Sequence, residues 1–205
     1  MEQLVDEVNA YTKANGFRAV FRNTSKPGTM EIVTTHDRRT SVKQKLGSVT
    51  VEVIRANGRK FTPVSTYEAK WRDRGEKVGI PAEIRGWYVV EEDRAEDLET
   101  SVPGIEPFID LEEAKPTLGA PTKFRGKDVL AIEQKSDSQR VITYVAKEGP
   151  LCPLGRHVWS APDNHKLELV IEKCGTDVSV AIPPDSKTLT AAQLNERVGL
   201  PSSAK

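Results

Sequence analysis

Two cysteines are the residues whose type and spacing most directly suggest chemistry in this chain. Cys152 lies within "RVITYVAKEGPLCPLGRHVW" and Cys174 within "LELVIEKCGTDVSVAIPP". If "LGRHVW" and "KLELVIEKC" pair across the turn "SAPDNH", a register centred on Asp163 sets the two cysteines opposite each other. Opposed residues of antiparallel strands have Cα atoms about 4.5–5.5 Å apart, which a disulfide accepts. We therefore predict a Cys152–Cys174 disulfide, which implies an oxidising compartment; two unpaired, buried thiols remain the alternative.

The remaining potential ligands do not predict a metal or nucleotide site. The three histidines, His36, His157 and His165, do not form a ligand set with two distant cysteines. The segments "GRKFTP" and "LGAPTK" lack the glycine spacing of a phosphate-binding loop. We therefore expect no metal and no cofactor.

Candidate catalytic residues lack the neighbours that a mechanism requires. No partner for a catalytic His157 can be identified from the sequence, and Ser160 and Ser186 have no nucleophile elbow around them. The acidic run Glu91-Glu92-Asp93 is better explained as the solvated start of a helix than as paired catalytic carboxylates. We therefore expect no enzyme activity, and a small hydrolase is the least favoured hypothesis.

The composition argues against a nucleic-acid partner. The 205 residues carry 30 Lys and Arg against 30 Asp and Glu, so the formal net charge is zero. Neutralisation of phosphates supplies most of the affinity for nucleic acids, and this chain has no basic run. No apolar run approaches the roughly 18 residues of a membrane span. For a mostly β chain of this length, a single domain over residues 1–205 is the better interpretation.

The chain opens with an amphipathic helix. In "MEQLVDEVNAYTKANG", Leu4, Val8 and Tyr11 form one stripe and Val5 lies beside it. The stretch lacks the basic start, apolar centre and cleavage site of a signal peptide. The protein is therefore either cytosolic or exported by a segment outside this sequence, and the predicted disulfide favours export.

Short strands separated by turn residues follow the helix. The stretches "FRAVFRN", "TMEIVTTHD", "SVKQKLG" and "SVTVEVIRANGRKFTPVS" predict strands, with Asn57-Gly58 as a two-residue hairpin turn. Val49, Val51 and Val53 alternate with polar residues, so one face of that strand is buried. Next, "TYEAKWRDRG" predicts a helical turn and "IRGWYVVEED" a strand, while "EDRAEDLET" and "PFIDLEEAK" predict short helices.

The second half has the clearest hairpin. In "KDVLAIEQKSDSQRVITYVAKEG", a turn at Asp137-Ser138 sets Ile132 opposite Thr143 and Leu130 opposite Val145. The stretches "KLELVIEKC" and "TDVSVAIPP" predict further strands, and "LTAAQLNERVGL" predicts a closing helix. This order of elements indicates an α+β fold with one large antiparallel sheet.

Parts of the chain resemble the LolA/LppX/LprG-like superfamily of exported lipoproteins and lipoprotein carriers. In the second half, the matching positions are Val145, Gly149, Pro150, Pro153, Leu154, Cys174-Gly175 and Pro183. In "ANGRKFTPVSTYEAKW", they are Gly58, Lys60, Phe61, Tyr67 and Trp71. The resemblance covers nearly the whole chain through motifs that are mostly structural. The lipobox cysteine of such lipoproteins is missing from this sequence.

The resemblance implies a strongly curved antiparallel sheet, a half-barrel, with helices covering its concave face. Members of the superfamily hold acyl chains of lipids or lipoproteins in the apolar space between sheet and helices, and others use this space in signalling. The implied location is extracytoplasmic, in the cell envelope or a periplasm-like space. The implied membrane association is peripheral or through a lipid anchor ahead of Met1.

The predicted ligand-binding residues are apolar side chains of the strands that would line such a cavity. They are Met30, Ile32, Val49, Val51, Val53, Leu130, Ile132, Leu167, Leu169 and Ile171. An ordinary filled core is the alternative for each of them. Trp71, Trp87 and Trp159 either line a pocket mouth or pack in the core or rim. The resulting hypothesis is binding or carriage of a lipid or acylated molecule; the alternative is a protein-interaction or envelope-sensor module without lipid.

Overall fold

Strands dominate the structure, a computed structural model that describes residues 1–23, 28–46, 49–93, 109, 114–160 and 165–200. In these ranges, 13 strands form one open sheet. The strands are β1 (Gly16–Asn23), β2 (Thr29–Thr34), β3 (Thr40–Leu46), β4 (Val49–Ala56), β5 (Arg59–Pro63), β6 (Tyr88–Glu92), β7 (Thr117–Leu118), β8 (Thr122–Phe124), β9 (Lys127–Lys135), β10 (Gln139–Ala146), β11 (Pro153–Ser160), β12 (His165–Gly175) and β13 (Thr188–Leu189). The helices are α1 (Glu2–Ala14), α2 (Val64–Asp73) and α4 (Ala191–Arg197), with the 3-10 turns η1 (Ala82–Ile84) and η2 (Asp185–Lys187).

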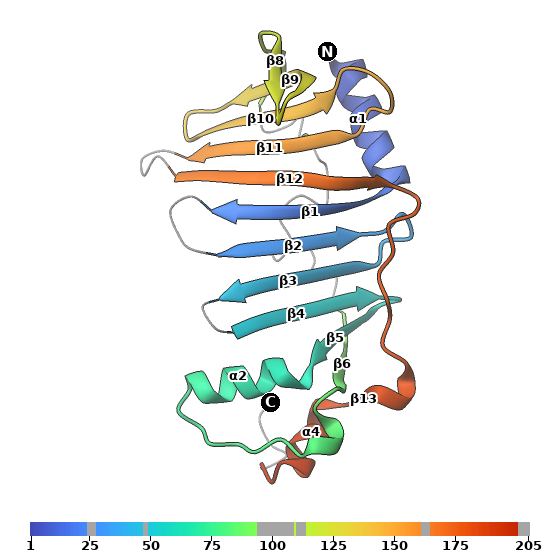
Figure 1. The fold of residues 1–205 in the computed structure, drawn as a ribbon, viewed down its shortest axis with the longest axis vertical. Coiled ribbons are helices and arrows are strands. Elements are labelled where there is room, and N and C mark those ends of the chain that lie inside the picture. The colour runs from blue at the N-terminus through green and yellow to red at the C-terminus, as the bar shows by residue number, and fades with distance from the viewer. Residues whose placement is uncertain (24–27, 47–48, 94–108, 110–113, 161–164, 201–205) are drawn as a thin grey trace.

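The strand order joins the two halves of the chain in the middle of the sheet. It runs β13-β6-β5-β4-β3-β2-β1-β12-β11-β10-β9-β7, and β8 also pairs with β9. Neighbours are antiparallel except for β13 and β6, which are parallel. The first strand thus pairs with the twelfth, and the two hairpin series extend outward from this junction (Figure 1).

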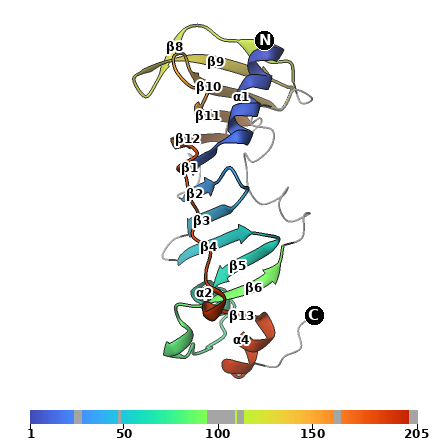
Figure 2. The ribbon, with the colours of Figure 1, turned by 90° about the vertical axis from the view of Figure 1, so that its right-hand side faces the viewer.

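The sheet is strongly curved, which confirms the predicted α+β class and half-barrel sheet. Seen from the side, α1 lies on the inner side of the curve, which we call the concave face, and the opposite side is the convex face (Figure 2). The expected cover of helices over the concave face is not shown by the described residues, because α1 packs near one end and α2 and α4 lie at the other. A helix of this length extends only about 20 Å, whereas the strands span nearly 60 Å at about 4.8 Å each.

The main core lies between α1 and the concave face. Val8 of the predicted apolar stripe and Val5 beside it are both fully buried. They pack in one cluster with Phe17, Ala19, Ile32, Ile109, Ile132, Val145, Leu169 and Ile171. Asn9 also fixes Ile109, because its Nδ2 donates to the Ile109 carbonyl at 2.9 Å and its Oδ1 accepts from the Ile109 N–H at 3.0 Å.

The stretch "TDVSVAIPP", which predicts a strand, is not one. Residues 176–184 run as irregular extended chain across the convex face after β12. Val178 and Val180 pack there against Val33, Ile54 and Phe61. Alternation indicates that one side of a segment is buried, and here that side lies on the sheet instead of belonging to it.

Turn chemistry predicts the hairpins correctly. Asn57 and Gly58 have φ angles of 54° and 69°, the positive values that a two-residue hairpin turn needs. In the β9–β10 hairpin, Ile132 pairs with Thr143 and Leu130 with Val145, as predicted. The short strands β7, β8 and β13 were not predicted. The stretch "EDRAEDLET" lies almost wholly, and "PFIDLEEAK" mostly, outside the described residues.

Candidate ligand-binding site on the concave face

Nine of the ten predicted ligand-binding residues share one face of the sheet, as the strand pairings show. Directly paired residues project to the same side. One row across the sheet contains Val53, Val42, Ile32, Ala19 and Ile171. The adjoining rows contain Val51, Met30, Leu169 and Ile132, with Leu130 and Leu167 in further rows. Val49 of β4 pairs through its backbone with Leu46 of β3. The alternation thus placed Val51 and Val53 on the same face as the buried residues Ile32 and Ile171.

These side chains fall into two groups by burial. Ile32, Ile132, Leu169 and Ile171 are buried and belong to the α1 core. Met30 and Leu130 are half-buried and pack against this core. Val51, Val53 and Leu167 are half-buried and belong to no apolar cluster of the described residues. The concave face therefore changes from a filled core beside α1 to partly accessible apolar surface further away.

Polar side chains share this face with the apolar ones. Thr143 is 1% exposed, and its hydroxyl has no hydrogen-bond partner among the described residues. Gln134 donates through Nε2 to the carbonyl of Ala114 at 3.0 Å. Arg156 lies between Thr143 and Leu169 in the strand register. The face can therefore offer polar contacts beside its apolar surface.

Two ion pairs from β4, β5 and the end of β6 lie at the border of the apolar surface. Arg55 Nη1 lies 3.8 Å from Asp93 Oδ1, and the side chains are only 9% and 6% exposed. Lys60 Nζ lies 3.0 Å from Glu91 Oε2. The prediction that residues 91–93 start a solvated helix was therefore wrong: Glu91 belongs to β6 and Asp93 is buried beside Arg55. The partners Arg55 and Lys60 lie more than 30 positions earlier in the sequence, so the local pattern does not reveal these pairs.

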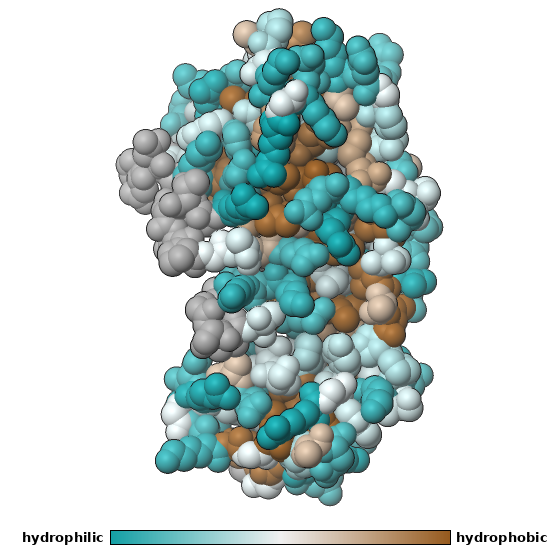
Figure 3. All heavy atoms as spheres, in the orientation of Figure 1, coloured by the Kyte–Doolittle hydropathy of each residue, from teal (hydrophilic) through white to brown (hydrophobic). Residues whose placement is uncertain are grey.

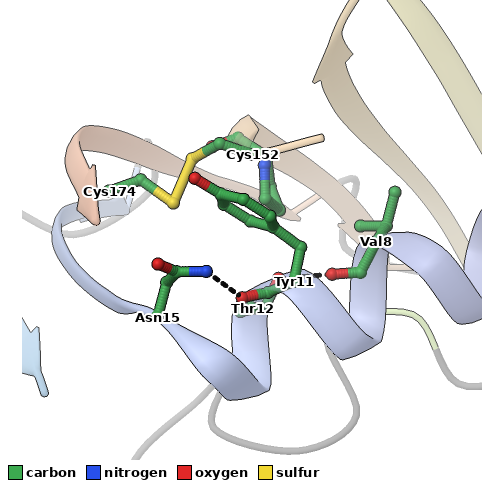
Figure 4. The surroundings of a disulfide bond; sticks show 7 residues. Val8, Tyr11, Thr12, Asn15, Cys152 and Cys174 are labelled. Carbon is green, nitrogen blue, oxygen red and sulfur yellow. Dashed lines mark hydrogen bonds between the residues drawn. A yellow bond between two sulfur atoms is a disulfide. The ribbon is translucent and has the colours of Figure 1, made fainter. Parts of the chain in front are cut away.

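The Cys152–Cys174 disulfide is present, as predicted, with a Cα–Cα distance of 6.4 Å. The predicted register was wrong by one residue, because Ser160 pairs with His165 and β11 begins only at Pro153. Figure 4 shows the bond beside the end of α1, with the ring of Tyr11 close to it. Both cysteines also pack against the α1 core. The bond therefore links the loop before β11 to the end of β12 beneath this helix.

A β-bulge places Cys174 on the concave face. Arg18 pairs with Lys173 but Ala19 pairs with Ile171, so Glu172 is the extra residue of β12. An extra residue reverses the alternation along a strand. Ile171 and Cys174 consequently face the same side although an odd number of positions separates them.

His157 has the partners that the sequence did not reveal. Its Nδ1 is hydrogen-bonded to Tyr144 Oη at 3.0 Å, and its Nε2 lies 3.4 Å from Glu168 Oε1, all on the convex face. Burial lowers the pKa of His157, and the hydrogen bond to Glu168 opposes this effect. Burial also raises the pKa of Tyr144, which makes its hydroxyl a weaker nucleophile near neutral pH. The arrangement is a satisfied polar chain on the sheet.

The three tryptophans have different surroundings. Trp71 is buried in the cluster around α2 and α4, which makes it a core residue. Trp159 is half-buried on the convex face, with Arg140 and Lys166 at 5.4 and 5.6 Å from its ring centre. Figure 3 shows this face, where polar atoms surround smaller apolar areas. Trp87 is half-buried and lines two surface hollows.

One hollow adjoins the predicted binding residues at the edge of the sheet. It has a volume of about 290 Å³ and lies between β7, β8 and β9, with Leu130 in its wall. Leu118, which is 56% exposed, also lines it. Within the described ranges, no three His, Cys, Asp or Glu residues come together as a metal site. No helix in these ranges is long and apolar enough to span a membrane.

Comparison with known proteins identifies the fold. No family model and no curated protein matches the chain. Lipoprotein LppX of Mycobacterium tuberculosis superposes with a TM-score of 0.54 at 10% identity, covering 88% of this chain and 99% of that one. An uncharacterized conserved protein from Thermus thermophilus gives 0.52 at 9% identity, covering 92% and 98%. The chain therefore has the fold of LppX, as the resemblance implied.

Proposed function

We propose that this chain binds or carries a lipid or lipidated molecule on its concave face, as an extracytoplasmic protein of the cell envelope. The observation that carries the proposal is the set of half-buried apolar side chains beyond α1. Val51, Val53 and Leu167 have no place in the apolar clusters of the described residues. Covering apolar surface of this kind with an acyl chain removes it from water, which lowers the free energy of the complex.

The expected affinity follows from the buried length of the chain. Each methylene group removed from water stabilises a complex by about 0.8 kcal/mol. Ten such groups give roughly 8 kcal/mol, which corresponds to a Kd of roughly 1 μM before the cost of association is subtracted. A short contact with only a few carbons is therefore insufficient. Binding requires an acyl chain that extends over several strands.

Two further observations support the proposal. The disulfide between Cys152 and Cys174 favours an oxidising compartment outside the cytoplasm. LppX, which has the same fold over nearly its full length, is a lipoprotein. The proposed attachment to the membrane is peripheral or through a lipid anchor.

A protein-interaction or envelope-sensor module is the second candidate, because of a specific feature of the convex face. Trp159 is half-buried there between Arg140 and Lys166, and His157 contacts its ring edge at a centroid distance of 5.4 Å. Tryptophan and arginine are enriched at protein interfaces. In this alternative, a protein partner binds the sheet and no lipid is carried.

Extraction and titration together test the first candidate. The protein is purified without detergent, extracted with organic solvent, and the extract is analysed by mass spectrometry for acyl-containing species. The extracted and refolded protein is then titrated with a fluorescent fatty acid. The proposal predicts a co-purified acyl compound or saturable micromolar binding of the probe. Absence of both would leave the interaction module as the better hypothesis.

A further inference from the structure

A groove on the convex side lies where the start of α2 meets the sheet. It has a volume of about 360 Å³. Its lining includes Lys43, Glu52, Ser65, Thr66, Arg85 and Trp87. Lys43 and Glu52 alternate with Val42, Val51 and Val53 of the concave face, so the sheet separates this groove from the proposed lipid site. The two sites are therefore independent.

The first turn of α2 offers unsatisfied donors to the groove. Its N-cap position is Pro63, which makes no side-chain cap hydrogen bond, and the first turn has no acidic residue. The Val64 N–H donates to the Trp87 carbonyl at 2.9 Å. The following N–H groups, of Ser65 and Thr66, have no acceptor within the helix. With the partial positive charge of the helix start, they favour a bound anion.

Two buried polar atoms of the same groove provide a second, separate indication. Thr66 is 1% exposed, and its hydroxyl has no hydrogen-bond partner in the described part of the chain. The indole Nε1 of Trp87 is likewise buried without a partner there. A buried donor left unsatisfied is costly, and native proteins rarely keep one without a reason. A ligand with several oxygen acceptors would satisfy both groups.

The charges of the groove select the sign of that ligand. Arg85 and Lys43 are exposed cations in its wall. Glu52 lies opposite Lys43 in the β3–β4 register, so the charges of Lys43, Arg85 and Glu52 sum to +1, and the helix start adds to this positive character. Burial and the nearby Glu52 raise the pKa of Tyr88, which also lines the groove. Tyr88 therefore keeps its proton and remains a hydrogen-bond donor at neutral pH.

We propose that this groove binds a phosphate group, carried by a free phosphate ester or by a lipid headgroup. The backbone N–H groups of Ser65 and Thr66, the Thr66 hydroxyl and the Trp87 indole would donate to the phosphate oxygens. Arg85 would add the paired donors that suit a phosphate. The site lies apart from the concave face, so an acyl chain and a phosphate group can bind at the same time.

Nuclear magnetic resonance of the wild-type protein tests the site with inorganic phosphate as the probe, against sodium chloride at equal ionic strength. We expect saturable shifts of the Ser65 and Thr66 amides and of the Trp87 indole N–H. Arg85→Gln should weaken binding at least tenfold. Arg74→Gln, at the other end of α2, is the matched control and should leave the phosphate affinity unchanged.

Thr66→Val separates a ligand-binding role from a structural one. Because the hydroxyl has no partner, its removal should weaken phosphate binding several-fold without lowering the melting temperature. If Arg85→Gln does not fold, Lys43→Gln on the exposed surface of β3 replaces it. Vesicles of phosphatidylcholine with phosphatidic acid distinguish the sources: competition with inorganic phosphate indicates a headgroup, and no competition a free ester. Unsaturable shifts, or equal affinity in wild type and Arg85→Gln, would overturn the proposal.

Discussion

A substitution at Val51 should have different effects in a filled core and in an open binding face. It is half-buried on the concave face. In a carrier, Val51→Trp should occupy cavity volume and weaken binding of a fatty-acid probe about tenfold, since each excluded CH₂ costs about 0.8 kcal/mol. In a filled core, the same change should overpack and cost about 1–3 kcal/mol of stability.

Thr50→Trp is the matched control for this substitution, because Thr50 is exposed and faces the convex side. Melting temperature and probe affinity are measured for both variants and the parent. Lost binding at little cost in stability supports the cavity. Marked destabilisation of Val51→Trp, together with no probe binding by the parent protein, would contradict it.

The environment of His157 predicts a pH effect on stability. Burial lowers the pKa of His157 below its ordinary 6.5, so the unfolded chain binds the proton more readily than the folded one. The stabilising contribution of the neutral ring is therefore complete above pH 6.5 and is lost as the pH falls toward the lowered pKa. We expect His157→Gln to melt with a weaker pH dependence between about pH 5 and 7. If plots of melting temperature against pH have the same slope for the parent and for His157→Gln over this range, the prediction is refuted.

Among the elements, the disulfide links the loop before β11 to the end of β12. Closing a loop of this size stabilises a protein by about 3 kcal/mol. The double variant Cys152→Ala with Cys174→Ala should therefore melt roughly 6–12 °C lower than the parent. Peptide mapping under non-reducing conditions checks the bond itself. Two freely alkylated thiols in oxidised protein would count against both the bond and the inference of export.

The packing of β8 on the sheet depends on Gly155. A Cβ at this position would meet the ring of Phe124 and would lie 2.7 Å from the carbonyl oxygen of Leu169. Gly155→Ala should thus cost about 1–3 kcal/mol of stability through overpacking. Gly79→Ala is the control, because a Cβ there meets nothing within 4 Å. Thermal melts of the two variants that coincide would show that β8 adjusts freely.

For the whole molecule, cargo binding should appear as thermal stabilisation. A ligand at a hundred times its Kd stabilises the folded state by about 2.7 kcal/mol, which corresponds to a rise in Tm of roughly 5–10 °C. We expect a long-chain fatty acid to produce this rise and acetate at the same concentration to produce none. Zinc should leave the Tm unchanged, because no metal-ligand cluster lies in the described residues. A rise in Tm with acetate but not with the fatty acid would argue against an acyl-binding site. So would the lack of a rise with either compound.

Features with a local signal could be predicted from the amino-acid sequence. The stripe of Leu4, Val8 and Tyr11 predicted α1, and the Asn57-Gly58 turn predicted the β4–β5 hairpin. Alternation then placed Val51 and Val53 on one face, because side chains of a strand alternate strictly between two sides. The curved sheet of the LppX fold was implied by the resemblance and confirmed by comparison.

The sequence could not predict which element covers each buried face, or which residues far apart in the chain come into contact. Alternation in residues 176–184 reported burial, but only the fold shows that this segment lies across the sheet. The bulge at Glu172 shifts the register that sets Cys174, and Tyr144 reaches His157 from another strand. Asp93, which follows β6, likewise forms an ion pair with Arg55 of β4. Such pairings depend on strand order and bulges, which arise from long-range packing. The local sequence pattern therefore does not predict them.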